Sequence, residues 1–364
     1  MIKYVTTILI FIPLLSFCQY TPGYQAEFFF GRQPSARVEA MGKGSVSLDG
    51  DMGTIYYNPA GLSNINGLEI NGTYATPFYL ADSAYYAYTG VGYRFNKYIQ
   101  VALSRYHWNW NMAAMITGFE RTPSTSNYTL TLASEPFSNL FLGVNANYYV
   151  WDVGIGDPAT TFYLDFGAIK KFNFLQRKTT QHESNIGASI ANLNYAKATF
   201  SYLDSEFTEA LPVTARFGAS YQFTLDKHIL LDTLKTLKLL IQSEYQTLLN
   251  SDYHSAIKVG GELSILEILA IRVGYYQEQV YDYSYPEVNH DQISDFTYGF
   301  GLQIPLDKLT KIPLSIKFDY TSLPQTPYST SFTEEELGKF SSYTVRLNWQ
   351  IKKMNSNNKL EAQL

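Results

Sequence analysis

Cysteine, charge and long hydrophobic runs are all scarce in this chain of 364 residues. Its one cysteine, Cys18, lies close to the amino terminus, so disulfide frameworks and thiolate metal sites are excluded from the rest of the chain. Charged residues make up 16% and the net charge is −5, which excludes a basic surface for nucleic acid. Beyond the amino terminus no apolar run approaches the ~20 residues that a membrane-spanning helix needs.

The short apolar run at the amino terminus predicts a secretory signal peptide over residues 1–18. The run follows Lys3 and is too short to remain in a bilayer as a helix. Cleavage after Cys18 would make Gln19 the first mature residue. The alternative is that Cys18 carries a lipid, but bulky Phe17 precedes it where lipoprotein sites have a small residue.

Aromatic residues are abundant, with 31 Tyr and 23 Phe, and apolar and polar residues alternate from residue 67 onward. In "LPVTARFGASYQFTL", Phe217 and Tyr221 share an apolar face, while Arg216 and Gln222 lie on the other. Such segments exceed the ~5–6 residues of ordinary strands and suit the ~9–11 of tilted strands that cross a membrane. The pattern predicts an all-β fold, a transmembrane antiparallel β-barrel of about 14 strands. The predicted strands are 67–76, 85–95, 98–106, 127–134, 139–151, 161–171, 184–199, 212–225, 236–248, 254–265, 269–282, 295–304, 312–322 and 341–351.

The links between these strands favour a bacterial outer-membrane location. Links on one side of the barrel are mostly long and several on the other side are short, which is the pattern of outer-membrane barrels. An even number of strands puts both ends of the chain in the periplasm. A soluble β-sandwich also alternates, but such long strands with no linker argue against it. We therefore expect a signal peptide (1–18), an N-terminal plug or hatch (19–66), a barrel (67–352) and a polar periplasmic tail (353–364).

Residues 19–66 do not alternate and are rich in glycine and turns. Asn58 precedes Pro59, so its side chain can cap a short helical turn that the proline begins. A barrel of ~14 strands leaves a lumen that must be plugged, lined with bulky side chains or left open. An inserted amino-terminal segment is the expected plug.

The stretch "SARVEAMGKGSVSLDGDMGTIYYNPAGL", followed by a barrel, resembles the PorV/PorQ group of outer-membrane proteins in the FadL superfamily. The resemblance implies a fourteen-stranded barrel whose amino-terminal region bears an Asn-Pro-Ala signature. The matching residues are Arg37, Ala40, Met41, Gly42, Gly44, Asn58, Pro59, Ala60, Gly61 and Leu62, and the predicted plug site consists of Arg37, Gly42, Gly44, Asn58, Pro59, Ala60 and Gly61.

This resemblance implies two functions that the shared motif does not separate. PorV-like proteins are accessory, docking components of type IX protein secretion, and FadL-like proteins transport hydrophobic molecules past the hatch and through the barrel wall. The docking role is the preferred expectation and the transporter the alternative, while the plug disfavours a non-specific porin. Expected partners are outer-membrane lipid, other outer-membrane proteins (the type IX translocon or its cargo) and, for a transporter, a hydrophobic ligand.

No motif predicts catalysis. The five histidines show no metal-ligand spacing, and the chain has no nucleophile elbow or phosphate loop. The "DGD" at 49–51 predicts a turn rather than a calcium loop. We expect no enzyme activity, cofactor or metal.

Charged residues at inward positions predict a lumenal network. When the barrel closes, its first and last strands become neighbours, so we expect Arg346 to pair with Glu69 or Asp319. The network would hold the plug through Arg37 or Glu39; the alternative is an ordinary structural network in a wet lumen. The predicted members are Glu69, Arg94, Arg216, Lys317, Asp319 and Arg346.

The loop "HWNWNM" with "AAMITGF" predicts an apolar lip above the membrane. It would first contact lipid in a transporter, or a partner protein in a docking subunit; the alternative is that it only sits in the outer leaflet. Its predicted residues are Trp108, Trp110, Met112, Met115 and Phe119.

Overall fold

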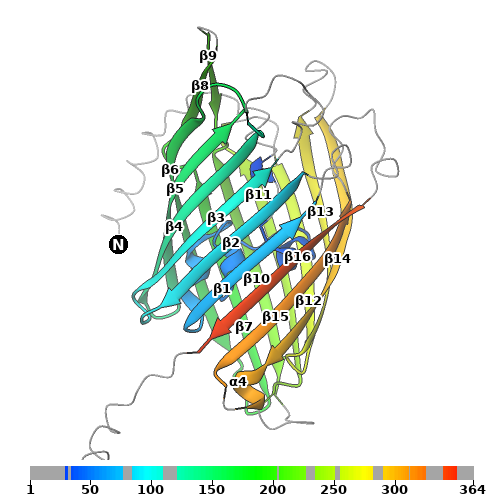
Figure 1. Ribbon diagram of the computed structural model, residues 1–364. Helices are drawn as coiled ribbons and strands as arrows, with labels where there is room; N and C mark the ends of the chain where they lie inside the picture. The colour runs from blue at the N-terminus through cyan, green and yellow to red at the C-terminus, as the bar shows by residue number, and fades with distance from the viewer. Residues whose placement is uncertain are drawn as a thin grey trace, which may run out of the picture.

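Fourteen antiparallel strands close into a barrel in the computed structural model (Figure 1). No helix among the described residues is long and apolar enough to cross a membrane. The structure describes residues 29–31, 34–76, 84–109, 121–202, 205–226, 234–250, 255–281, 290–310, 312–324 and 339–350. The strands are β1 (Leu68–Ala75), β2 (Tyr85–Arg94), β3 (Gln100–Asn109), β4 (Ser124–Phe137), β5 (Leu140–Asp152), β6 (Ala159–Phe174), β7 (Thr180–Ala191), β8 (Lys197–Tyr202), β9 (Ser205–Ala210), β10 (Thr214–Leu225), β11 (Leu237–Leu248), β12 (Ser255–Ile265), β13 (Leu269–Tyr281), β14 (His290–Pro305), β15 (Leu314–Pro324) and β16 (Lys339–Trp349).

Closure joins the first strand to the last. β1 pairs with β16 from Leu68↔Trp349 to Ala75↔Ser342, so the sheet has no free edge there. All other barrel neighbours follow one another along the chain, except that β7 pairs with β10 because the hairpin β8–β9 is inserted between them. The prediction of fourteen barrel strands is confirmed.

Several predicted boundaries differ from the observed ones; β14, for example, begins at His290 and not at residue 295. The predicted strand 184–199 ends at residue 191, because Asn192 and Tyr195 adopt positive φ values of 56° and 53° and the Asn192 side chain accepts a hydrogen bond from the Ala196 backbone at 2.8 Å. The chain turns there and continues into the hairpin β8–β9. The predicted strand 98–106 also continues further, to Asn109, because alternation persists through Trp108.

The two faces of the barrel differ as the alternation predicts. On β10, Phe217 is 59% exposed on the outer face, whereas neighbouring Arg216 is 8% exposed in the lumen. On β16, Val345 and Leu347 face outward while Arg346 is buried. A closed barrel with an apolar exterior and a polar interior is suited to a lipid bilayer, and this barrel spans the bacterial outer membrane.

Residues 34–66, called the plug here, fill the lumen (Figure 1). They form α3 (Ala36–Glu39) and two 3₁₀ helices, η2 (Met52–Thr54) and η3 (Pro59–Asn64). Apolar plug side chains pack against the inner wall and are almost fully buried. Outside the barrel ring, α4 (Leu306–Leu309) joins β14 to β15. The predicted signal peptide (1–18) and tail (353–364) lie outside the described residues.

Candidate functional site

The Asn-Pro-Ala-Gly turn fixes the plug to the wall. Asn58 is the N-cap of η3, with its Oδ1 accepting from the Ala60 backbone at 3.0 Å, and Pro59 begins the helix as the sequence predicts. Asn58 Nδ2 donates to the carbonyl oxygens of Val46 at 2.7 Å and of Ala168 in β6 at 3.1 Å. The Asn58 side chain therefore caps the start of η3, binds a second plug segment and binds the barrel wall.

Glycines let the plug backbone approach the wall. A Cβ at Gly167 in β6 would overlap the Asn58 side chain, and a Cβ at Gly274 in β13 would overlap the backbone of Gly42. Gly42 itself has φ +73°, a left-handed conformation that glycine adopts without strain, and its N–H donates to Thr297 Oγ1 at 2.9 Å. The predicted plug residues Gly44, Ala60 and Gly61 are also buried, with Gly44 against Gln242 and Gly61 against Thr54.

Three arginines and three carboxylates alternate around a closed circuit of ion pairs, called the charge ring here. Two members come from the plug and four from the wall strands β12, β13, β15 and β16. The successive N···O distances are Arg37–Glu262 2.9 Å, Glu262–Arg272 2.6 Å, Arg272–Asp319 2.8 Å, Asp319–Arg346 2.9 Å, Arg346–Asp51 2.6 Å and Asp51–Arg37 3.4 Å.

The plug members keep their charge because of their partners. Burial alone would raise the pKa of Asp51, but Arg346 and Arg37 beside it lower that pKa below its ordinary value. Burial alone would lower the pKa of Arg37, and the two carboxylates at its side raise it instead. Arg37 binds Glu262 with two nitrogens, at 2.9 and 3.0 Å. The ring thus joins plug and wall by buried, charge-assisted contacts.

The predicted lumenal charges divide into three groups. Arg346 and Asp319 belong to the charge ring and form an ion pair with each other, which is one of the two pairings that the sequence predicts for Arg346. Glu69 is bound to the plug separately, accepting from the Met52 backbone at 2.8 Å. Arg216 and Lys317 face the lumen outside the ring, and Arg94 is only half-buried at the end of β2.

Sequence reasoning missed Glu262, Arg272 and the role of Asp51. Glu262 and Arg272 face each other across the β12–β13 hairpin. The short turn between these two predicted strands could have indicated that the two residues are paired. Asp51, expected only as part of a turn, does cap η2 through its Oδ1 while its Oδ2 meets the two arginines. Further plug anchors are Lys171 with Asp49 at 3.1 Å and Glu244, which accepts from the backbones of Ser45 and Val46 at 2.7 and 2.8 Å.

Aromatic side chains dominate the lumen beside β2–β6. Trp108 stacks on Tyr86 with ring centroids 5.0 Å apart, and Phe29 lies 4.8 Å from Tyr106. These rings belong to one buried cluster that also includes Tyr149 and residues of the hairpin β8–β9. The apolar ring faces give this side of the lumen a surface suited to flat or aliphatic molecules.

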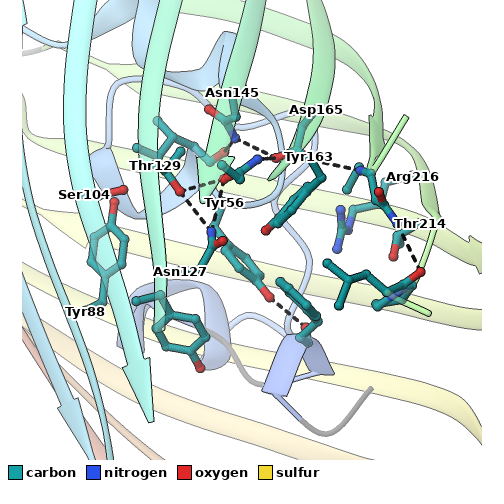
Figure 2. Close-up of a pocket in the computed structure, with 18 residues that line it drawn as sticks. Tyr56, Tyr88, Ser104, Asn127, Thr129, Asn145, Tyr163, Asp165, Thr214 and Arg216 are labelled. Carbon is teal, nitrogen blue, oxygen red and sulfur yellow. Dashed lines mark hydrogen bonds between the residues drawn. The ribbon is translucent and has the colours of Figure 1, made fainter. Parts of the chain in front are cut away.

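A small cavity remains between this cluster and the plug (Figure 2). Its volume is about 30 Å³, which is room for water and not for a larger molecule. Tyr56 of the plug reaches across it and donates to the Phe30 carbonyl at 2.9 Å. Burial raises the pKa of Tyr56, so its hydroxyl remains a donor.

The wall beside the cavity carries a connected set of polar groups, which Figure 2 shows pointing toward one another. Thr129 donates to Asn147 Oδ1 at 2.7 Å, and Asn147 donates to Asp165 at 2.8 Å. Asp165 also accepts from Asn145 at 3.1 Å. The cavity therefore has an aromatic side and an amide side.

A second hollow lies on the outside of the same wall. This outer groove, of about 950 Å³, runs over β16, β1 and β2–β6 and is lined mainly by apolar side chains, among them Ile70, Leu103 and Tyr148. Ser104 and Thr129 line both the lumenal cavity and the outer groove. One layer of strand therefore separates the two hollows at β3–β4.

The predicted apolar lip is wrong for Trp108. Trp108 lies within β3, faces the lumen and is fully buried by the aromatic cluster, because the strand alternation continues past the predicted loop start. The other predicted lip residues, Trp110, Met112, Met115 and Phe119, lie outside the described residues.

No protein-family model matches the sequence, and no curated protein matches it. Among solved structures, a Pseudomonas aeruginosa FadL homologue is 12% identical, with 88% of this chain and 98% of that chain covered and a TM-score of 0.46. The Pseudomonas putida toluene transporter TodX is 10% identical (86% and 96% covered, TM-score 0.41), and the Ralstonia pickettii toluene transporter TbuX is 10% identical (88% and 98%, TM-score 0.40). We therefore infer the function of the present chain from its own lumen and outer wall.

Proposed function

We propose that this barrel is a non-enzymatic transporter of hydrophobic small molecules across the outer membrane. The observation that carries the proposal is that the lumenal cavity and the outer groove share Ser104 and Thr129. A molecule that enters among the aromatic rings would have only this part of the wall between it and the lipid. The resemblance of the plug motif to the FadL superfamily points to the same class of function.

The described conformation is closed, so transport requires a local rearrangement. The cavity of about 30 Å³ must enlarge before it can hold a hydrocarbon. Phe30 and Tyr56 are the residues to move, because they close the cavity through one hydrogen bond and ring contacts rather than ion pairs. The charge ring can stay intact while they do so.

We would test this proposal by measuring uptake of radiolabelled oleate. The cells lack their own outer-membrane transporter for hydrophobic compounds and express the full chain. Ser104→Phe would obstruct the shared wall and is expected to reduce uptake at least fivefold. Ser264→Phe is the matched control, since Ser264 is an inward position of β12 that lines neither hollow. Uptake no faster than in cells without the barrel, or equal uptake by both variants, would refute the proposal.

A second candidate function is docking in type IX secretion, which the PorV/PorQ resemblance implies. The supporting observation is the hairpin β8–β9, which projects beyond the rim of the barrel (Figure 1). Phe207 on this hairpin is 51% exposed and stacks on Phe200 at 5.0 Å, so an apolar surface is presented above the membrane. The nearly filled lumen also suits a subunit that passes nothing through itself.

A mild-detergent pull-down of the tagged protein from its native outer membrane tests docking. Recovery with a large translocon barrel or with cargo bearing type IX signals, and its loss in Phe207→Ser, would support the docking role. Recovery of the protein alone, with lipid or fatty acid in its organic extract, would favour transport.

A further inference from the structure

Arg105 is a cation on the lipid-facing side of the barrel. It lies within β3 at an outward, exposed position and lines the outer groove. Among the described strands of the barrel, the other outward-facing Lys and Arg residues are Lys170, opposite the first residue of β5, and Lys339, the first residue of β16. The next outward residues of β3 are His107 and Asn109, so Arg105 lies at the edge of the apolar band, where a cation is favoured if it meets an anionic partner.

Uncharged neighbours orient the Arg105 guanidinium without neutralising it. Its Nη2 lies 3.0 Å from His107 Nδ1 and 3.2 Å from Ser126 Oγ, and its Cζ lies 5.4 Å from the centre of the Tyr128 ring. No carboxylate among the described residues forms an ion pair with it. These hydrogen bonds use Nη2, which leaves the N–H groups of Nε and Nη1 for an anion. Guanidinium groups held in this way suit phosphate oxygens.

The surrounding groove has the shape for acyl chains. Gly72, Thr89 and Arg105 are opposite one another on β1, β2 and β3, and a Cβ built at Gly72 meets no atom within 4 Å. The hollow therefore begins where an outward side chain is missing, beside the cation. The residues that line the groove come from seven neighbouring strands, and most of them are apolar. Such a surface suits acyl chains.

We infer that Arg105 and the outer groove form a binding site for an anionic diacyl phospholipid, with the phosphate at Arg105 and the acyl chains in the groove. The N–H groups of Nε and Nη1 of Arg105 complement a phosphate, and the apolar lining of the groove faces the bilayer and complements acyl chains. The site does not depend on transport, since a lipid can bind the outer wall of a closed barrel. It would explain why the apolar face tolerates an arginine there.

Native mass spectrometry of the detergent-purified full chain tests this site, with phosphatidylglycerol, phosphatidylcholine and oleate as probes. The wild type is expected to bind phosphatidylglycerol about tenfold more tightly than phosphatidylcholine, and Arg105→Gln is expected to remove that preference. Lys170→Gln, which removes an outward cation outside the groove, should keep it. Because Arg105→Gln removes a charge from the lipid face, it should still fold, which heat-modifiable migration on a gel verifies.

Gly72→Leu tests the groove separately from the charge. The new side chain has open space to occupy, so it should fill the part of the groove at β1 and weaken binding of both phospholipids about equally while the barrel stays folded. Equal binding of the two phospholipids by the wild type, an unchanged preference in Arg105→Gln, or unchanged binding in Gly72→Leu would overturn the site. Tighter Arg105-dependent binding of oleate than of phosphatidylglycerol would overturn the phospholipid as its occupant.

Discussion

The two sides of the lumen hold the plug in different ways. Strands β12, β13, β15 and β16 contact it through the charge ring, in which each buried charge has two partners of opposite sign. Strands β2–β6 contact it mainly through aromatic rings and amides, with the Asn58 turn and the Lys171–Asp49 ion pair at β6, and here a cavity remains. The outer groove backs onto this second side. The difference indicates that the charge ring fixes the plug in one position, whereas the contacts beside the cavity can rearrange.

Physical chemistry supports this division. Removing one partner of a buried ion pair leaves an uncompensated charge, so the charge ring permits one position of the plug. Aromatic packing is less directional, and rings can slide or rotate while they keep apolar contacts. An opening motion would therefore begin at the aromatic contacts beside the cavity.

The largest effect is expected from Arg346→Met. It would leave Asp51 and Asp319 each with one partner fewer at a buried site, at a cost of about 3–5 kcal/mol in the free energy of unfolding. Urea unfolding of the barrel in detergent measures this cost, and planar-bilayer conductance shows whether the plug has loosened. Arg94→Met is the control, because Arg94 is half-buried and outside the ring; equal effects of the two variants would contradict the anchoring role.

A smaller effect is expected from Gly274→Ala. The added methyl group would overlap the Gly42 backbone, and such overpacking costs about 1–3 kcal/mol. The same substitution at Gly72 on the outer face meets no atom and should change the unfolding free energy little. If both substitutions were equally harmless, the plug would not lie against β13 as described.

Asn58→Ala should have a more modest effect, about 1–2 kcal/mol, because it removes both the cap of η3 and the donor to the β6 wall. Asn58→Ser separates the two contributions, since serine can cap the helix but cannot reach the wall. We expect raised single-channel conductance in Asn58→Ala and a smaller rise in Asn58→Ser. Conductance unchanged from wild type in both variants would argue against a sealing role for this turn.

Alternation along the chain predicted the strands and their faces because both are local properties of a strand. It could place Arg346 near Asp319, since neighbouring strands bring both into the lumen. It could not show that Asp51 and Arg37 complete the ring, because that depends on how a non-repetitive plug folds within the barrel. The turn at Asn192 was missed for a similar reason: it is set by two residues with positive φ, which alternation does not detect.

The smallest effect is expected on the aromatic side, from Tyr106→Phe. The Tyr106 hydroxyl is buried and has no hydrogen-bond partner among the described residues, while its ring packs against Phe29 and Tyr86. Removing the oxygen keeps the ring contacts, so the unfolding free energy should change by less than about 0.5 kcal/mol or rise slightly. Tyr56→Phe, which removes the hydrogen bond to the Phe30 carbonyl, should cost about 1 kcal/mol. If Tyr106→Phe were as costly as Tyr56→Phe, the Tyr106 hydroxyl would make a polar contact as well, and the contrast between the charge ring and the contacts beside the cavity would weaken.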